Sequence, residues 1–373
     1  MSSSEAVVRT AIPADNAQLC ALFSATPMES DLVLSVERDP DFFALYRLQG
    51  PDHAVTVAEV EGEIAGMATS IARDGYIEGQ RTRVGYAGDL RLSSKLRGGF
   101  FLGRTFADGF REHCARFGCE VMYTAIFASN RVAIRALVRR SKRFPDKPIY
   151  RPWLDYDILN VMFTWRRAPR PSAFVVRRAT AADLGAIAAL LARDHAARPF
   201  GYAIDEGVLR ERVATWPDFG VENFYLAWRG EALVGVAAPW DAHAVKRFRV
   251  LDYRGSMRWA RRGFNLGAKL GGFTSLPAPG GLLRYCYLTH VSVVDDDPAV
   301  MAALLDRIYA DLHGRGYAFL TAYRGAGDPL APAFDRYRCI AFPAKLFTVS
   351  LPGSRFNDWD PGPARPGFEI AFA

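Results

Sequence analysis

The sequence contains two copies of one pattern, and this internal repeat constrains the fold more than any other feature. Residues 6–23 read Ala-Val-Val-Arg-Thr-Ala, then reach Pro-Ala-Asp and an apolar helical run. Residues 174–191 read Phe-Val-Val-Arg-Arg-Ala, then reach Thr-Ala-Ala-Asp-Leu and a second helical run. Each stretch predicts a short strand followed by an amphipathic helix. Because a repeat of this length is the size of a domain, we expect two domains in tandem.

Both copies continue with the same order of elements. A hairpin, a long alternating strand, a helix and an apolar strand follow, and a short helix with a final pair of strands is expected to complete each copy. The expected elements are 53–60, 64–71, 84–92, 99–116 and 121–127 in the first copy, and 224–228, 232–237, 283–293, 298–314 and 318–323 in the second. Strands that alternate with helices, with hairpins at the start and end, predict an α/β fold: in each copy, a mixed, mostly antiparallel sheet flanked by helices.

The Pro-Arg-Pro-Ser stretch at 169–172 is the expected linker. It separates an N-terminal domain, 1–168, from a C-terminal domain, 173–352, and a tail follows at 353–373. The second copy also carries an insertion, 243–282, with a basic amphipathic stretch. We expect this insertion to be a lid packed across the junction between the copies; the alternative is a helix that lies on a membrane surface.

The net charge is +7 and the sequence pI about 9.2, with the excess shared by the two halves. Such a balance suits an anionic partner such as a CoA ester, an acidic carrier protein or a membrane surface, or it reflects an Arg-rich solvated surface. Nucleic-acid binding is not indicated, because no corresponding motif accompanies the charge. The start of the chain does not resemble a signal peptide, and no apolar stretch reaches membrane-spanning length. The five cysteines have no metal-ligand or disulfide spacing, so we expect a cytoplasmic protein without a metal.

A glycine-rich turn follows the long strand of the first copy. Arg97-Gly98-Gly99 stands between this strand and the next helix. Glycines allow a close approach to the backbone, and a helix N-terminus presents unpaired N–H groups. A phosphate group of a ligand would fit there.

The order of elements and this turn resemble the GNAT acetyltransferase superfamily, and the resemblance covers nearly the whole chain as two copies. It implies an acyltransferase that moves an acetyl or longer acyl group from acetyl-CoA or another acyl-CoA to an amine of a small molecule. The family's Arg/Gln-x-x-Gly-x-Gly/Ala signature is met in part, since Phe100 and Leu102 stand at its glycine positions if Arg97 is its first residue. The resemblance assigns acyl-CoA binding to these residues of the first copy: Leu90, Leu92, Arg97, Gly98, Gly99, Phe100, Phe101, Gly103, Arg104 and Asn130.

The remaining family positions concern catalysis. Asn130 fits the first part of a second signature, and it is also a good helix N-cap. The tyrosine that protonates the leaving thiolate in many relatives falls on Leu137, so Tyr123, Tyr150 or a water would take this role. Asp89, a polar residue within an apolar strand, is the candidate general base, with a structural carboxylate as the alternative.

The second copy departs further from the family. Its loop reads Asp295-Asp296-Asp297-Pro298, which favours a helix cap and repels a pyrophosphate. We therefore expect acyl-CoA in the first copy, with His290 of the second copy facing the substrate cleft. Two alternatives stay open: a catalytically inactive tandem protein that binds a ligand or a partner, and an enzyme that takes its acyl group from an acidic acyl carrier protein.

Overall fold

The computed structural model describes residues 6–96, 99–140, 142 and 144–372. The elements of the first copy are β1 (Val7–Thr10), α1 (Asn16–Ala25), β2 (Leu32–Glu37), α2 (Ala44–Arg47), β3 (Asp52–Val60), β4 (Glu63–Ile77), β5 (Gln80–Leu92), α3 (Gly99–Phe117), β6 (Val121–Phe127), α4 (Arg131–Val138) and β7 (Ile149–Met162). Those of the second are β8 (Val175–Arg178), α5 (Leu184–Ala196), β9 (Gly201–Tyr202), α6 (Glu206–Thr215), β10 (Tyr225–Arg229), β11 (Ala232–Trp240), β12 (Arg247–Tyr253), α7 (Met257–Gly271), β13 (Tyr285–Val293), α8 (Pro298–Leu312), β14 (Phe319–Gly325) and β15 (Cys339–Ser350). The predicted α/β class and the predicted repeat are confirmed.

The repeat extends to an ion pair at the start of each copy. In the first copy, the guanidinium of Arg9 on β1 donates to both oxygens of Asp15, at 2.7 and 2.8 Å. In the second, Arg177 on β8 makes the same pair with Asp183, at 2.8 and 2.7 Å. Each carboxylate also accepts from the backbone three residues earlier. The pair thus joins the first strand to the turn that opens the first helix.

These pairs predict a pH-dependent contribution to stability. The hydrogen bonds from Arg177 hold the pKa of Asp183 well below its ordinary value. A depressed carboxyl pKa stabilises the fold above pH ~4, and this stabilisation is lost as the pH falls. We expect Asp183→Asn to lower the free energy of unfolding by about 1–2 kcal/mol at pH 7, since Arg177 is partly exposed. Urea unfolding at pH 7 and pH 3 measures this. An equal loss at both pH values would contradict the role of the charge.

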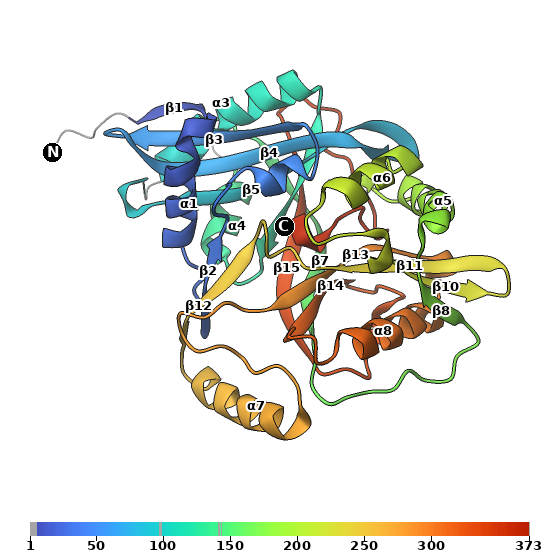
Figure 1. Ribbon diagram of the computed structural model, residues 1–373. Coiled ribbons are helices and arrows are strands. Elements are labelled where there is room, and N and C mark those ends of the chain that lie inside the picture. Colours follow the sequence, from blue (N-terminus) through green and yellow to red (C-terminus); the bar gives the residue numbers. More distant parts are fainter. Residues whose placement is uncertain (1–5, 97–98, 141, 143, 373) are drawn as a thin grey trace.

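The two copies share one sheet because their last strands are exchanged. The order of the main path is β1-β3-β4-β5-β6-β15-β7-β14-β13-β11-β10-β8. β15 of the second copy lies between β6 and β7 of the first, and β7 lies between β15 and β14 of the second. The prediction that each copy ends in a pair of strands is therefore wrong. Each copy ends in one long strand that pairs with strands of the other copy (Figure 1). The apolar pattern of this region did predict strands, but it does not encode the partner of each strand.

Helices cover both faces of this sheet (Figure 1). α1 and α3 pack on β4, α5 packs on β13 and β4, and α8 packs on β10 and β11. The largest apolar core runs through both copies, with Phe23 and Leu45 from the first and Phe224 and Trp240 from the second. Among the described residues, no helix is long and apolar enough to cross a membrane.

The insertion bridges the copies with a strand. β12 pairs antiparallel with β2 in a separate two-stranded sheet. Helix α7 lies at the outer end of the insertion, away from the junction (Figure 1). It is held by its own return segment: the side-chain amide of Asn265 donates to the Leu276 carbonyl at 2.9 Å and accepts from the Leu276 N–H at 2.8 Å. β12 thus makes the contact across the junction that we expected from a helical lid.

The C-terminal tail runs back into the molecule. Phe356, Ile370 and Phe372 are buried, and the end of the chain lies between the two copies (Figure 1). Arg73 on β4 donates to the main-chain oxygen of Gly367 at 3.1 Å. The tail therefore belongs to the core that joins the copies.

Candidate active site

The candidate site lies where β5 and β6 separate. Within the described residues, these parallel strands pair at Gly85↔Met122 and Tyr86↔Tyr123. Beyond this point the two strands no longer pair: β5 stays on β4, and β6 stays on β15, its partner along its whole length. A wedge therefore opens between the two strands toward their C-terminal ends.

A β-bulge marks the edge of this wedge. The register between β4 and β5 shifts opposite Asp89, whose φ is 51°. Positive φ is uncommon outside glycine, and a bulge re-aims the strand at such a point. In the second copy, His290 has the same φ of 51° at a bulge on β13. Asp89 and His290 thus occupy corresponding positions in the two copies.

Asp89 is the centre of a buried polar cluster. One of its carboxylate oxygens accepts from the Tyr46 hydroxyl at 2.8 Å and from Arg38 at 3.2 Å. The Thr69 hydroxyl in turn donates to the Tyr46 oxygen at 3.1 Å. Burial alone would raise the pKa of Asp89, but Arg38, Arg91 and the Tyr46 hydrogen bond outweigh it and lower this pKa. Asp89 is thus held as a carboxylate, which makes it a weak proton acceptor.

Arg38 brings unpaired hydrogen-bond donors to this cluster. Its side chain is 2% exposed, and its Nε and Nη1 have no hydrogen-bond partner within the described residues. The guanidinium lies against the rings of Phe23 and Tyr46, with 5.0 and 5.4 Å to the ring centroids. The Nε of Arg91 likewise has no hydrogen-bond partner in the part of the chain that the structure describes. Buried N–H groups of a cation favour an anionic or strongly polar ligand group.

Lys246, in the loop before β12, provides the group best suited to proton transfer. It is 4% exposed, and its ammonium lies 3.4 Å from the carbonyl oxygen of Ala371 in the tail. Burial, together with the charges of Arg38 and Arg91, lowers the pKa of Lys246 to about 7, although Asp89 opposes this shift. An amine with this pKa exchanges protons readily at neutral pH. No local pattern in the sequence singled out Lys246, Arg38 or Tyr46.

Tyr123, the expected general acid, lies one strand away from Asp89. Its ring packs against Tyr86 and Phe200, at centroid distances of 5.2 Å in both cases. Its hydroxyl lies beside Tyr202 and Arg73. Burial raises the pKa of Tyr123 well above its ordinary value. Asp89 lies on β5 and Tyr123 on the neighbouring strand β6, and within the described residues they share no hydrogen bond.

The expected acyl-CoA residues fall into three groups. Leu90 and Leu92 follow the bulge on β5, at the edge of the wedge. Asn130 is the N-cap of α4, and its side-chain oxygen accepts from the Ala133 N–H at 3.1 Å, which confirms the predicted cap. Arg97 and Gly98 lie outside the described residues. The main chain at the start of α3 contains five more of these residues, and their side chains lie outside the described part of the structure: Gly99, Phe100, Phe101, Gly103 and Arg104.

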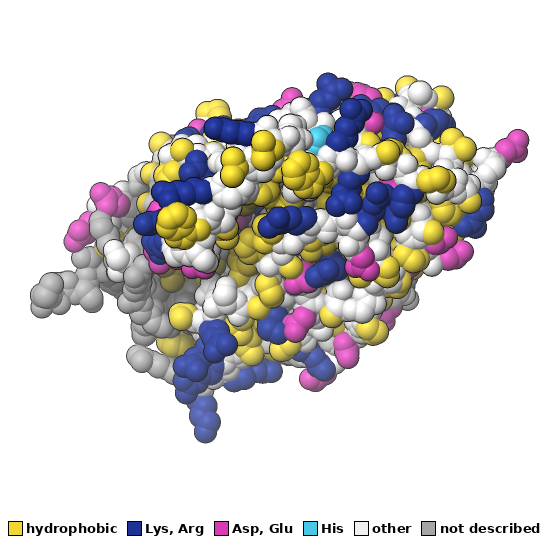
Figure 2. Space-filling view, turned by 90° about the horizontal axis from the view of Figure 1, so that it is seen from below, with side chains coloured by type: hydrophobic (Ala, Val, Ile, Leu, Met, Phe, Trp, Pro, Cys, Tyr) yellow, Lys and Arg dark blue, Asp and Glu magenta, His cyan; other side chains and the backbone are white. Residues whose placement is uncertain are grey.

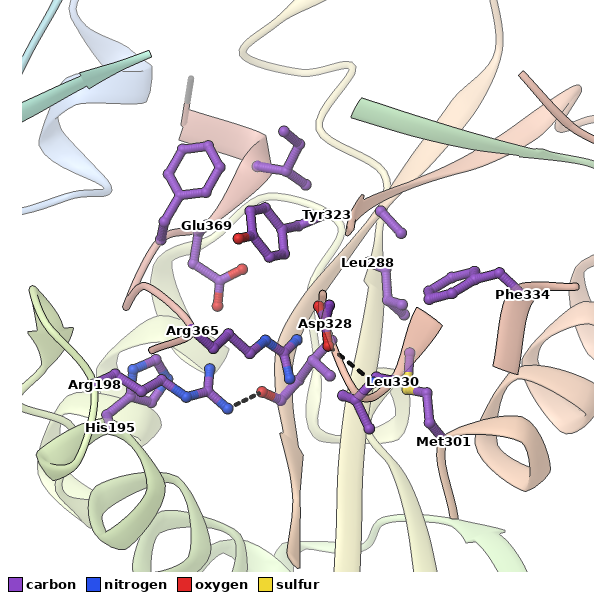
Figure 3. A pocket seen from close by; sticks show the side chains of 14 residues that line it. His195, Arg198, Leu288, Met301, Tyr323, Asp328, Leu330, Phe334, Arg365 and Glu369 are labelled. Atoms are coloured by element: carbon purple, nitrogen blue, oxygen red, sulfur yellow. Dashed lines mark hydrogen bonds between the residues drawn. The ribbon is translucent and has the colours of Figure 1, made fainter. Parts of the chain in front are cut away.

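The corresponding wedge of the second copy is filled (Figure 3). Arg198, Arg365 and Glu369 converge between β13 and β14, and the cavity that remains is about 20 Å³. This volume is enough for about one water molecule. Glu369 of the tail accepts from the main-chain N–H of His290 at 2.9 Å. A pantetheine chain has no room in this wedge.

His290 and the acidic loop have structural partners. The imidazole of His290 is fully buried, lies 2.9 Å from Arg212 and packs against the rings of Phe219 and Phe224, so it does not face a substrate cleft as expected. Asp297 caps α8 by accepting from the Ala299 N–H at 2.8 Å, as its sequence predicted. Within the described residues no group of three or more His, Cys, Asp or Glu residues is placed to hold a metal ion.

Comparison with known proteins identifies the fold. No protein-family model matches the chain, and no curated protein matches it at a significant level. Among solved structures, it is similar to a GCN5-related N-acetyltransferase from Sphaerobacter thermophilus, with a TM-score of 0.55 and 14% identity over 98% of each chain. It is also similar to N-myristoyltransferase of Saccharomyces cerevisiae with bound myristoyl-CoA, with a TM-score of 0.60 and 9% identity over 95% of this chain and 80% of that one. The chain therefore has the GNAT fold, as the sequence resemblance predicted.

Proposed function

We propose that the protein is an acyl-CoA-dependent N-acyltransferase with one active site, in the wedge of its first copy. The observation that carries this proposal is the buried polar cluster where the pairing of β5 and β6 ends: Asp89 stands at a bulge, and Arg38 beside it has unpaired N–H groups. The corresponding wedge of the second copy is filled by the tail. The donor is acetyl-CoA or a longer acyl-CoA, and the acceptor is an amine of a small molecule. The yeast structure with a similar fold holds myristoyl-CoA, which supports a long acyl chain as one donor.

In this proposal the main chain of the wedge binds the donor. The pantetheine arm lies along Leu90 and Leu92, and the pyrophosphate meets the N–H groups at the start of α3. The unpaired N–H groups of Arg38 face a polar group of the substrate. These contacts position the thioester carbonyl next to the amine.

The proton then moves through Lys246. The neutral amine attacks the thioester carbonyl carbon, the C–N bond forms, and the amine proton passes to Lys246 directly or through one water. The C–S bond breaks as the carbonyl re-forms. Protonated Lys246, with a pKa of about 7, is a stronger acid than a thiol of pKa ~8.5 and returns the proton to the leaving thiolate. Asp89 stays a carboxylate and does not act as the base. Tyr123, whose pKa is raised, does not act as the acid and lines the wedge.

Calorimetry with acetyl-CoA and myristoyl-CoA tests the proposal. We expect one bound molecule per chain, because the second wedge is filled. We expect Gly98→Asp to weaken binding about tenfold, since it brings a carboxylate to the pyrophosphate as in the second copy's loop. Asp295→Asn, in that second loop, is the matched control and leaves the affinity unchanged. Absence of binding for both CoA esters would contradict the proposal.

A second candidate function is ligand binding without catalysis. It is favoured by Leu137 at the position of the family's tyrosine and by Phe100 and Leu102 at its glycine positions. A thiol-release assay across a panel of small-molecule amines separates the two. Acyl-CoA binding without thiol release from any amine would support the inactive protein.

A further inference from the structure

Helix α7 exposes apolar side chains to the outside of the molecule. Its inner face packs on the return segment of the insertion: Ala268 is buried, and the ring of Phe264 packs on Phe273 with 5.2 Å between centroids. Its outer face carries Trp259, Leu266 and Leu270, which are 70%, 63% and 77% exposed. Steps of seven and four residues place these three side chains along one stripe of the helix.

Cations flank this apolar stripe. Arg258, Arg262 and Lys269 are exposed, and the Arg262 guanidinium lies 4.6 Å from the centre of the Trp259 ring. From residue 253 to residue 294 the sequence contains no Asp or Glu. In the view from below, basic and hydrophobic side chains lie next to one another on the side of the molecule that bears α7 (Figure 2).

We propose that the outer face of α7 docks the protein on an anionic lipid surface. A helix that lies at a membrane interface combines an apolar face, a Trp at headgroup depth and flanking Lys or Arg residues. Each cation near an anionic surface adds to the attraction. α7 is convex and lies at the periphery, so its stripe meets a flat, deformable surface without a complementary groove. Asn265 ties α7 to its return segment, and Phe273 of that segment packs on Trp165 of the first copy with 5.8 Å between ring centroids, so the whole protein moves with α7.

Vesicle flotation with the full chain tests this inference. We expect binding to vesicles of phosphatidylcholine mixed with phosphatidylglycerol, and much weaker binding to phosphatidylcholine alone. Leu266→Ser with Leu270→Ser is expected to reduce partitioning on the order of tenfold or more. Val175→Ser is the matched control, because Val175 is also exposed, at 68%, but lies on β8. Both changes are at exposed positions and leave the fold intact.

Charge and fluorescence supply independent readouts. Replacing Arg262 by Glu is expected to weaken binding at least about fivefold, and added salt to weaken the wild type. Tryptophan emission shifts to the blue on binding, and Trp259→Phe abolishes that shift although six other tryptophans remain. The proposal is overturned if anionic vesicles do not bind, or if the Leu variants bind as wild type. Binding to polyglutamate but not to vesicles would assign the face to an acidic protein and also overturn it.

Discussion

Lys246→Met is expected to lower kcat at least about 100-fold, the usual contribution of a positioned proton-transfer group. Methionine keeps the length and the apolar stem of lysine but accepts no proton. Folding survives this change, because burial already disfavours the charged form of Lys246. The lowered pKa of the wild-type lysine costs stability, because the unfolded chain binds this proton more tightly. The cost grows as the pH falls from ~10 to about 7 and is complete below that. The variant therefore unfolds at the same temperature or a higher one at pH 7.

The pH dependence of kcat/KM distinguishes Lys246 from Asp89 as the proton acceptor. If Lys246 is the acceptor, activity rises with pH through about 7 as its proton leaves. Because the Asp89 charge raises the pKa of Lys246, Asp89→Asn shifts this midpoint to lower pH and preserves activity above it. Lys246→Arg, which stays charged, remains inactive throughout. If instead Asp89→Asn is inactive at every pH and Lys246→Met retains the wild-type profile, Asp89 is the base.

Local features of this fold were predicted from the sequence, because local chemistry determines them. The Asn130 and Asp297 caps each depend on a donor two or three residues away. The repeat predicted the long strands at 84–92 and 283–293, which carry Asp89 and His290 at corresponding bulges. Each of these features is a property of a short window, in which periodicity and capping chemistry are informative.

The polar cluster of the candidate site depends on distant parts of the chain. Arg38 and Tyr46 are 51 and 43 positions from Asp89, and Lys246 is in the insertion of the other copy. No spacing rule connects such residues. β12 pairs with β2 across more than 200 positions, and this pairing brings the start of the insertion close to the first copy. The local elements of each copy were thus predictable, whereas the exchange of the last strands and the residues around Asp89 were not.

The strand exchange predicts that the first copy does not fold alone. Both neighbours of β7, which are β14 and β15, belong to the second copy. In a fragment of residues 1–168, β7 would expose two unpaired edges and the apolar face that now packs in the core. We expect this fragment to be insoluble or to unfold without a cooperative transition. A soluble monomer with a cooperative thermal transition would contradict the structural role of the exchange.

Cleavage of the folded chain tests whether the first copy needs β15 itself or only the covalent link to the second copy. A protease site inserted between Ser172 and Ala173, which are exposed, opens the linker without touching a strand. The two fragments are expected to stay together in size-exclusion chromatography, because β15 makes continuous ladders with both β6 and β7. They should separate in denaturant. After its removal, we expect the mixture of both fragments to refold, and neither fragment to refold alone. Fragments that part under native conditions would mean that each copy closes its own sheet. If they stay together, the pairing of β15 with β6 and β7 is sufficient to join the two copies without the linker.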